Sequence, residues 1–164
     1  MGRKERTEEE LRKASEHLCY EIWMLQAVAR ELLSGRVGQR VLNNALIESF
    51  AIHTRNLLDF LYSGNPWEDD VIAEDFFPPA EDWAKERPEK SELLGKIHGR
   101  VGKEVAHLTY GRLYVTREAK KWDFRTIADD INKTFERFLA IVPKHLLGDR
   151  WESYKRKFDE ASEG

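Results

Sequence analysis

Cysteine is nearly absent from this sequence: Cys19 is the single one among 164 residues. One cysteine cannot form an internal disulfide, and such usage is typical of a reducing compartment. No apolar run approaches the roughly 20 residues that a membrane-spanning helix needs, and residues 1–10 lack the apolar stretch of a secretory signal. We therefore expect a cytoplasmic protein that does not enter membranes.

The motifs that mark common enzyme classes are also missing. There is no phosphate-binding loop, no GxGxxG after a strand, no GxSxG and no HExxH. These absences argue against nucleotide-fold enzymes, serine hydrolases and zinc enzymes, so we expect neither a metal nor a cofactor. The net charge of −3 provides no general attraction to nucleic acid or to an anionic membrane.

Helical periodicity is the main pattern that the sequence does contain. A capping box at Thr7–Glu10 begins a first helix, which ends near Gly35, and Ser91 and Asp123 are predicted to cap two later helices. Pro143 interrupts the last of them. The length favours one domain. We predict an all-α fold, a four- to five-helix up-down bundle in a single domain of residues 1–164.

The most apolar long segment is 39–62, which we expect to be the central helix. Its apolar side chains occupy most of the helix circumference and leave only a narrow polar strip. A helix of this kind is predicted to be covered on most sides. The broad face consists of Leu42, Leu46, Phe50, Leu57, Phe60 and Leu61, extended by Val41, Ala45, Ile47, Ile52 and Leu58.

The third predicted helix contains small residues at regular spacing: Gly95, Gly99, Gly102 and Ala106. Each glycine in a helix costs up to about 1 kcal/mol relative to alanine. Close approach of another helix or a ligand would account for this cost, and we favour it. The alternative is that the helix is interrupted near Gly99.

A long loop at 63–84 separates the second and third helices. It has seven acidic residues and no basic one, but also Trp67, Phe76, Phe77 and Trp83, which a disordered tail would lack. We expect an ordered acidic loop with a helical turn near 71–73. Residues 85–121 carry a charge of +5. One hypothesis is that the loop covers the basic third helix; the alternative is that both segments are simply solvated.

The candidate site lies on the third helix. Arg100, Glu104 and His107 share one edge of it, and Tyr110 and Arg112 follow. His53 lies in the apolar face of the central helix and could meet them. Histidine titrates near neutral pH and arginine stabilises a phosphorane, so this set suits acid–base chemistry on a phosphodiester.

Each of these residues also has a simpler structural explanation. A histidine in an apolar face, such as His53, is more often a core residue bonded to backbone or to a carboxylate. Arg55 and Asp59 have the spacing of an ordinary ion pair, and the same holds for Arg100 and Glu104. Both explanations remain open at this stage.

Arg100 and His107 are separated by six residues, and this pattern resembles the Arg-x(4–6)-His motif of HEPN domains. The resemblance implies a helical bundle, often a homodimer, that binds a nucleotide or cleaves RNA without metal, in toxin–antitoxin or defence systems. It implies that Arg100 holds the phosphate and that His107 transfers the proton. These ribonucleases usually carry a polar residue where Val101 stands, so an inactive relative also fits.

Two functions are therefore carried forward from the sequence. The first is an HEPN-like protein that acts on RNA or a nucleotide through Arg100 and His107, supported by His53, Tyr110 and Arg112. In this hypothesis Arg55, Asp59 and Glu104 orient the site. The rival is a non-enzymatic homodimer or partner-binding helical module, in which the glycines and the aromatic loop form the interface.

Overall fold

The computed structural model describes residues 3–36, 38–78, 82–106, 110–116 and 121–154. Within these ranges the regular structure is entirely helical. The α-helices are α1 (Glu8–Leu33), α2 (Arg40–Leu61), α3 (Trp83–Glu86), α4 (Glu92–Arg100) and α5 (Phe124–Ile141). The remaining turns are η1 (Ala73–Phe76), the π-helical η2 (Val101–Ala106), η3 (Tyr110–Tyr114) and η4 (Lys144–Leu146).

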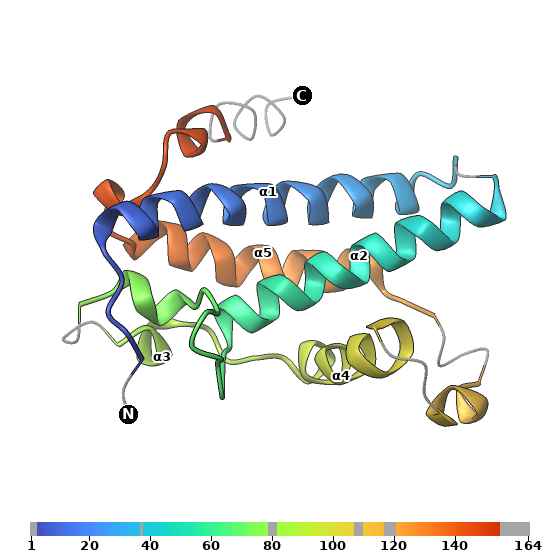
Figure 1. Cartoon of the computed structure of the whole chain (residues 1–164). Helices are drawn as coiled ribbons and strands as arrows, with labels where there is room; N and C mark the ends of the chain where they lie inside the picture. Colours follow the sequence, from blue (N-terminus) through green and yellow to red (C-terminus); the bar gives the residue numbers. More distant parts are fainter. Residues whose placement is uncertain (1–2, 37, 79–81, 107–109, 117–120, 155–164) are drawn as a thin grey trace.

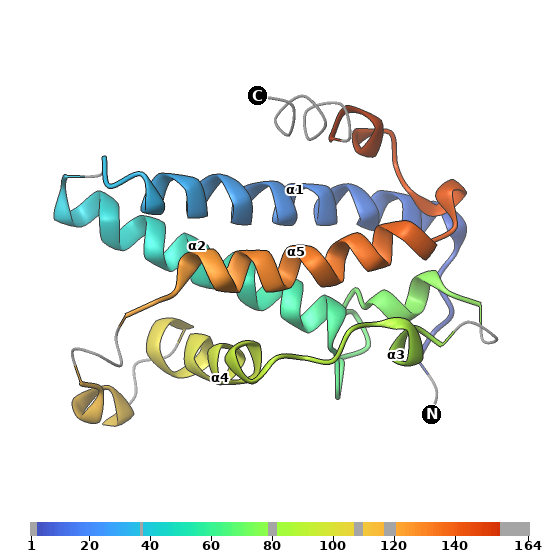
Figure 2. The ribbon, with the colours of Figure 1, turned by 180° about the vertical axis from the view of Figure 1, so that it is seen from behind.

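The main helices alternate in direction (Figures 1 and 2). α1 and α2 run antiparallel, α4 follows with its η2 extension, and α5 returns along α1 and α2. This arrangement confirms the predicted all-α up-down bundle. No helix of the described ranges has the length and apolarity needed to cross a membrane.

Local signals in the sequence explain where the helices begin and end. Thr7 forms the predicted capping box with Glu10, and Ser91 and Asp123 each accept a backbone N–H from the first turn that follows. These oxygens satisfy amide groups that have no partner within a helix. Gly35 has a φ of 66°, a value that glycine adopts without strain, directly after the last residues of α1.

An aromatic core fills the end of the bundle near α3. The Phe138 ring of α5 is fully buried and contacts Phe60 of α2 at a centroid distance of 5.1 Å. Trp83 is also buried, and its Nε1 donates 2.9 Å to the carbonyl oxygen of Leu61 at the end of α2. Rings of Phe76, Phe77 and Phe135 complete the contacts around Phe138. Phe76 and Trp83 of the 63–84 loop are therefore part of the core and Phe77 packs against it, as predicted, but Trp67 is 79% exposed, so the prediction that it anchors the loop is wrong.

The central helix is less covered than its apolar pattern predicted. Most apolar side chains of its second half are buried, but Ile52 there is 50% exposed, and Val41 and Leu42 in its first half are 79% and 54% exposed. The prediction that neighbours cover α2 on most sides is therefore wrong for its first half. The first half of the helix extends toward the α1–α2 turn, away from α3 (Figure 1).

Close packing along the glycines of the third helix is also not observed among the described residues. A Cβ placed on Gly95, Gly99 or Gly102 would meet no atom within 4 Å. The α-helical hydrogen bonding ends at Arg100 and continues as the π-helical turn η2. The change of helix type next to Gly99 agrees with the alternative of an interruption. The side chain of Ala106 lies outside the described structure.

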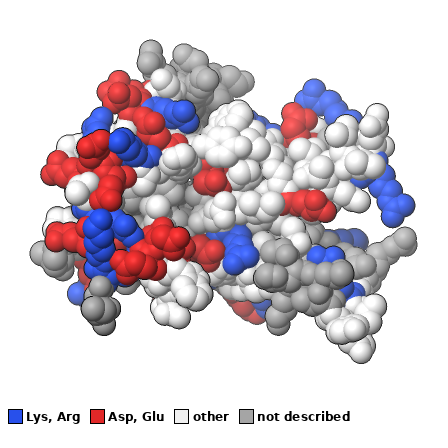
Figure 3. Space-filling model, viewed as in Figure 1, with Lys and Arg blue, Asp and Glu red and all other residues white. Residues whose placement is uncertain are grey.

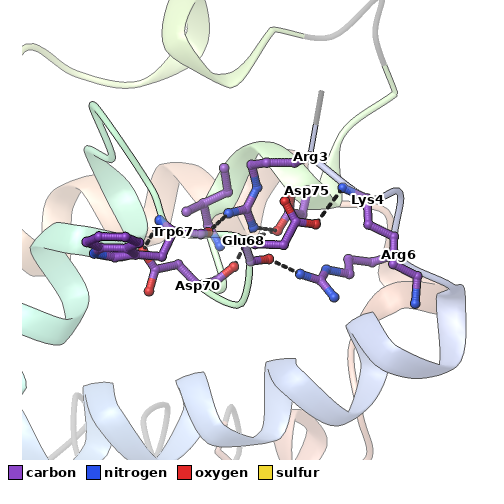
Figure 4. A network of polar contacts seen from close by, with 8 residues as sticks. Arg3, Lys4, Arg6, Trp67, Glu68, Asp70 and Asp75 are labelled. Atoms are coloured by element: carbon purple, nitrogen blue, oxygen red, sulfur yellow. Dashed lines mark hydrogen bonds and ion pairs between the residues drawn. The ribbon is translucent and has the colours of Figure 1, made fainter. Parts of the chain in front are cut away.

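The acidic loop contacts the N-terminal segment rather than the third helix (Figure 4). Arg3 donates to the carbonyl oxygens of Trp67 and Asp70 and forms an ion pair with Asp75 at 3.2 Å. The backbone N–H of Lys4 donates 2.9 Å to Glu68. The hypothesis that this loop covers the basic third helix is therefore wrong for the described residues. Glu74 does pair with a residue of the basic stretch, Arg87, but this arginine precedes α4.

Charges are unevenly placed on the face drawn in Figure 3. Acidic and basic side chains gather over the end where the N-terminal segment meets the loop, whereas uncharged residues cover much of the middle. The acidic loop is thus paired with the start of the chain, a pairing that was not predicted from the sequence.

Candidate functional site

Two of the predicted site residues cannot be placed. His107 lies outside the described residues, and for Glu104 only the backbone, within η2, is described. The remaining ones divide into separate groups. Arg100 packs on Trp122, which lines one pocket together with Arg112, while Asp59 and Arg55 belong to a second group on α2 and α4.

Arg100 ends α4 and packs over an aromatic ring. Its guanidinium carbon is 4.7 Å from the centroid of the Trp122 ring, and its Nη1 donates 3.3 Å to the carbonyl oxygen of Lys121. Trp122 is half-buried and meets Phe50 of α2 edge to face. A cation over an indole face is the most favourable cation–π pair. The segment before α5 thus fixes the position of the arginine.

Trp122 also lines an open cavity of about 300 Å³, which we call the Trp122 pocket. Arg112 lies in its wall, and its Nη2 donates 3.4 Å to the carbonyl oxygen of Val105 in η2. The Nε–H of Arg112 is buried, with no hydrogen-bond partner among the described residues. The other lining side chains are Asn44, Ile47, Glu48, Val105 and Val115.

The η3 turn beside this pocket exposes large side chains. Tyr110, Leu113 and Tyr114 are 88%, 75% and 84% exposed. Tyr110 therefore faces solvent, and the prediction that it supports a partly buried site with His53 is wrong. Exposed aromatic rings next to arginines are typical of surfaces that stack on nucleobases.

His53 has the structural role that the sequence left open as the simpler explanation. It is buried, and its Nδ1 lies 2.7 Å from Oε2 of Glu21 on α1. The same carboxylate oxygen accepts a hydrogen bond from Asn56 Nδ2 at 3.1 Å. Because this set joins α1 to α2, the predicted part of His53 in a shared site with Arg100 is not supported.

Asp59 lies at the centre of the second polar group. Arg55 Nε donates to it at 3.4 Å, which confirms the predicted ion pair. Its other oxygen lies 2.6 Å from Nε2 of His98 on α4, and Nδ1 of His98 lies 3.3 Å from Nζ of Lys90. Sequence reasoning missed His98 and Lys90. The sequence could have pointed to His98, because it follows the buried Ile97 and so lies at the edge of the helix face that meets α2.

The pKa of Asp59 reflects opposing influences. Its partial burial acts to raise the pKa, but the hydrogen bond from His98 and the charge and hydrogen bond of Arg55 together lower it more. The net result is a pKa below the ordinary value, so the carboxylate is ionised near neutral pH. An ionised Asp59 can therefore orient the imidazole of His98.

No set of three His, Cys, Asp or Glu side chains that could hold a metal ion occurs in the described parts of the chain. The side chains of the two groups are arginines, a lysine, a histidine, an aspartate and aromatic rings. Comparison of the sequence with protein-family models and curated proteins, and of the structure with solved structures, finds no match.

Proposed function

We propose that this protein is an HEPN-like helical bundle that binds RNA or a nucleotide at the Trp122 pocket. The observation that carries the proposal is the combination of Arg100 stacked on Trp122 with Arg112 in the wall of the same pocket. Arginine fits phosphate oxygens bidentately, and an indole ring stacks on any base.

The exposed rings of η3 support the same function. Tyr110 and Tyr114 present aromatic faces to solvent next to the pocket, where unstacked bases of a single strand could pack. The net charge of −3 does not oppose this, because residues 85–121 carry +5. Binding depends on the lysine and arginine side chains that contact the phosphates, and these can be concentrated in one region of a protein whose net charge is negative.

Binding of a labelled single-stranded RNA, followed by fluorescence anisotropy, tests this proposal. Arg112→Gln is expected to weaken binding and to reduce the slope of affinity against salt by about 1, because one phosphate contact is lost. Arg150→Gln removes the same charge from an exposed side chain outside the pocket and should leave binding unchanged. Equal losses in both variants, or no binding by the wild type, would contradict the proposal.

Cleavage is a separate part of the proposal. Arg100 would hold the phosphate and His107 would transfer the proton, with no metal needed. RNA incubated with the protein and a chelator should be cleaved by the wild type and left intact by Arg100→Ala and by His107→Ala. Binding without cleavage would identify a catalytically inactive RNA-binding relative.

A homodimer or partner-binding module is the second candidate. It is favoured by the exposed Val41, Leu42 and Ile52 and by the open space around Gly99. Light scattering after size exclusion should find a dimer that Gly99→Leu dissociates. Gly64→Leu is the matched control, since a Cβ there also meets no atom within 4 Å. A monomeric wild type would rule this candidate out.

A further inference from the structure

A row of hydrogen-bonded side chains connects α2, α4 and the segment between α3 and α4. Asp59 Oδ1 lies 2.6 Å from His98 Nε2, and His98 Nδ1 lies 3.3 Å from Lys90 Nζ. Lys90 is half-buried, and the His98 side chain is 29% exposed. The three side chains therefore form a partly enclosed group with a defined order.

The direction of the hydrogen bonds follows from the donors. A lysine ammonium can only donate, so His98 Nδ1 accepts from Lys90. The imidazole proton is then on Nε2 and is donated to the carboxylate of Asp59. This is the order of carboxylate, imidazole and nucleophile found in activated serine and cysteine sites, with an amine in the position of the nucleophile.

The surroundings of Lys90 lower the pKa of its amine. Burial lowers the pKa of its amine, the charge of Arg87 lowers it further, and Asp59 has the opposite, smaller effect. Nζ of Lys90 and the guanidinium of Arg87 each lie 5.1 Å from the centroid of the Tyr62 ring. The two cationic groups are thus held close to one aromatic ring.

An open cavity of about 480 Å³ adjoins the amine. Lys90, Arg87 and Tyr62 line it together with Pro88 and Glu89. Arg87 Nη1 donates 3.0 Å to the carbonyl oxygen of Leu61, which fixes the guanidinium at the cavity wall. A small molecule in this cavity could place an anionic group on Arg87 and a carbonyl carbon near Lys90.

We propose that Lys90 is a nucleophilic amine that forms a Schiff base with a small aldehyde bearing an anionic group. His98 is the base and Asp59 is the positioning residue. This activity is independent of RNA binding at the Trp122 pocket. It adds a second site, in the segment between α3 and α4, beside the end of α2.

The step is balanced without any other reagent. Lys90 Nζ gives a proton to His98 Nδ1, and its lone pair forms a bond to the carbonyl carbon. His98 passes this proton to the carbonyl oxygen. It then takes a second proton from the nitrogen of the carbinolamine and passes it to the resulting hydroxyl group, which leaves as water while the C=N bond forms. One ammonium and one aldehyde thus give one protonated imine and one water, with no change of oxidation state.

Pyridoxal 5′-phosphate is a suitable probe because it combines an aldehyde with a phosphate. Borohydride reduction of the imine followed by peptide mass spectrometry measures labelling at each lysine. Lys90 is expected to react at least about tenfold faster than Lys96. This threshold is set low, because a positioned base typically increases a rate by roughly a hundredfold. Lys96 is the matched control within the same molecule, since it is 67% exposed and paired with Glu92. Equal labelling of the two lysines in the wild-type protein would overturn the proposal.

Substitutions then separate the roles of the neighbours. His98→Gln should remove the difference between Lys90 and Lys96, and Arg87→Gln should remove it for the phosphate probe but not for pyridoxal. Asp59→Asn should lower the labelling rate of Lys90, and Asp59→Glu should restore it, which a purely structural role would not require. Unchanged labelling of Lys90 in a folded His98→Gln variant would also overturn the proposal.

Discussion

The two ends of the bundle differ in how their apolar side chains are covered. At the end near α3, Phe60, Trp83 and Phe138 are each at most 2% exposed. At the opposite end, Val41 of α2 and Leu113 of η3 are 79% and 75% exposed (Figure 1). Both ends are rich in large side chains, so composition does not explain the difference. What differs is whether another segment packs on them.

The covered end has three additional segments that the open end lacks. The N-terminal residues, the acidic loop with η1, and α3 all pack where α2 ends and α5 ends. Arg87 and Trp83 both donate to the carbonyl oxygen of Leu61, so even the last turn of α2 is satisfied. At the open end, by contrast, α4 changes to the π-helical η2, and arginines and tyrosines remain at the surface. We therefore expect the covered end to contribute most of the folding stability and the open end to bind RNA.

The largest expected effect tests this assignment directly. Phe138→Ala removes a fully buried ring from the aromatic core and should lower the free energy of unfolding by about 3–5 kcal/mol. Leu113→Ala at the open end should change it by less than about 0.5 kcal/mol, because the side chain is 75% exposed. Urea denaturation measures both.

RNA binding should respond in the opposite order. Leu113 lies beside the Trp122 pocket, so Leu113→Ala is expected to change the affinity for RNA more than Phe138→Ala does. Both affinities are measured at a temperature at which the Phe138→Ala variant is folded. A large loss of stability from Leu113→Ala would mean that η3 is covered in solution, and the contrast between the two ends would then disappear.

The parts of the fold that depend on local interactions could be predicted from the sequence. Thr7, Ser91 and Asp123 each cap the helix that follows within three residues, so their signals need no knowledge of tertiary structure. The buried half of α2 was likewise evident from its apolar pattern. The exposed half has the same pattern, and periodicity alone cannot say whether a neighbour is present.

The site residues depended on contacts between distant segments. Asp59 and His98 are 39 residues apart, and neither spacing nor composition indicates that they meet. For the same reason the glycine spacing at Gly95, Gly99 and Gly102 did not indicate that this face is open within the described chain, since regular spacing is compatible with both a packed and an open face. The motif at Arg100 lies where α4 becomes a π-helical turn, and such turns are frequent at functional sites.

A smaller effect is expected from separating the N-terminal segment from the acidic loop. Arg3→Gln removes an ion pair with Asp75 and hydrogen bonds to two backbone carbonyls, and the Arg3 side chain is only 20% exposed. Loss of such charge-assisted bonds should cost roughly 1–2 kcal/mol of unfolding free energy. Amide exchange should also become faster at Asp70 and Asp75, whose N–H groups close turns at 3.2 Å in this loop.

Lys4→Gln is the matched control for this last prediction. It removes the same charge one residue later, but the Lys4 side chain is 68% exposed and lies 3.9 Å from Glu10, while its contact to Glu68 is made by the backbone. Its cost should stay within about 0.5 kcal/mol, with exchange in the loop unchanged. If both variants cost the same, the specific contacts of Arg3 would not hold the loop. Net charge at the N-terminus would then account for the stability of the covered end. Raising the salt concentration should in that case abolish this contribution to stability.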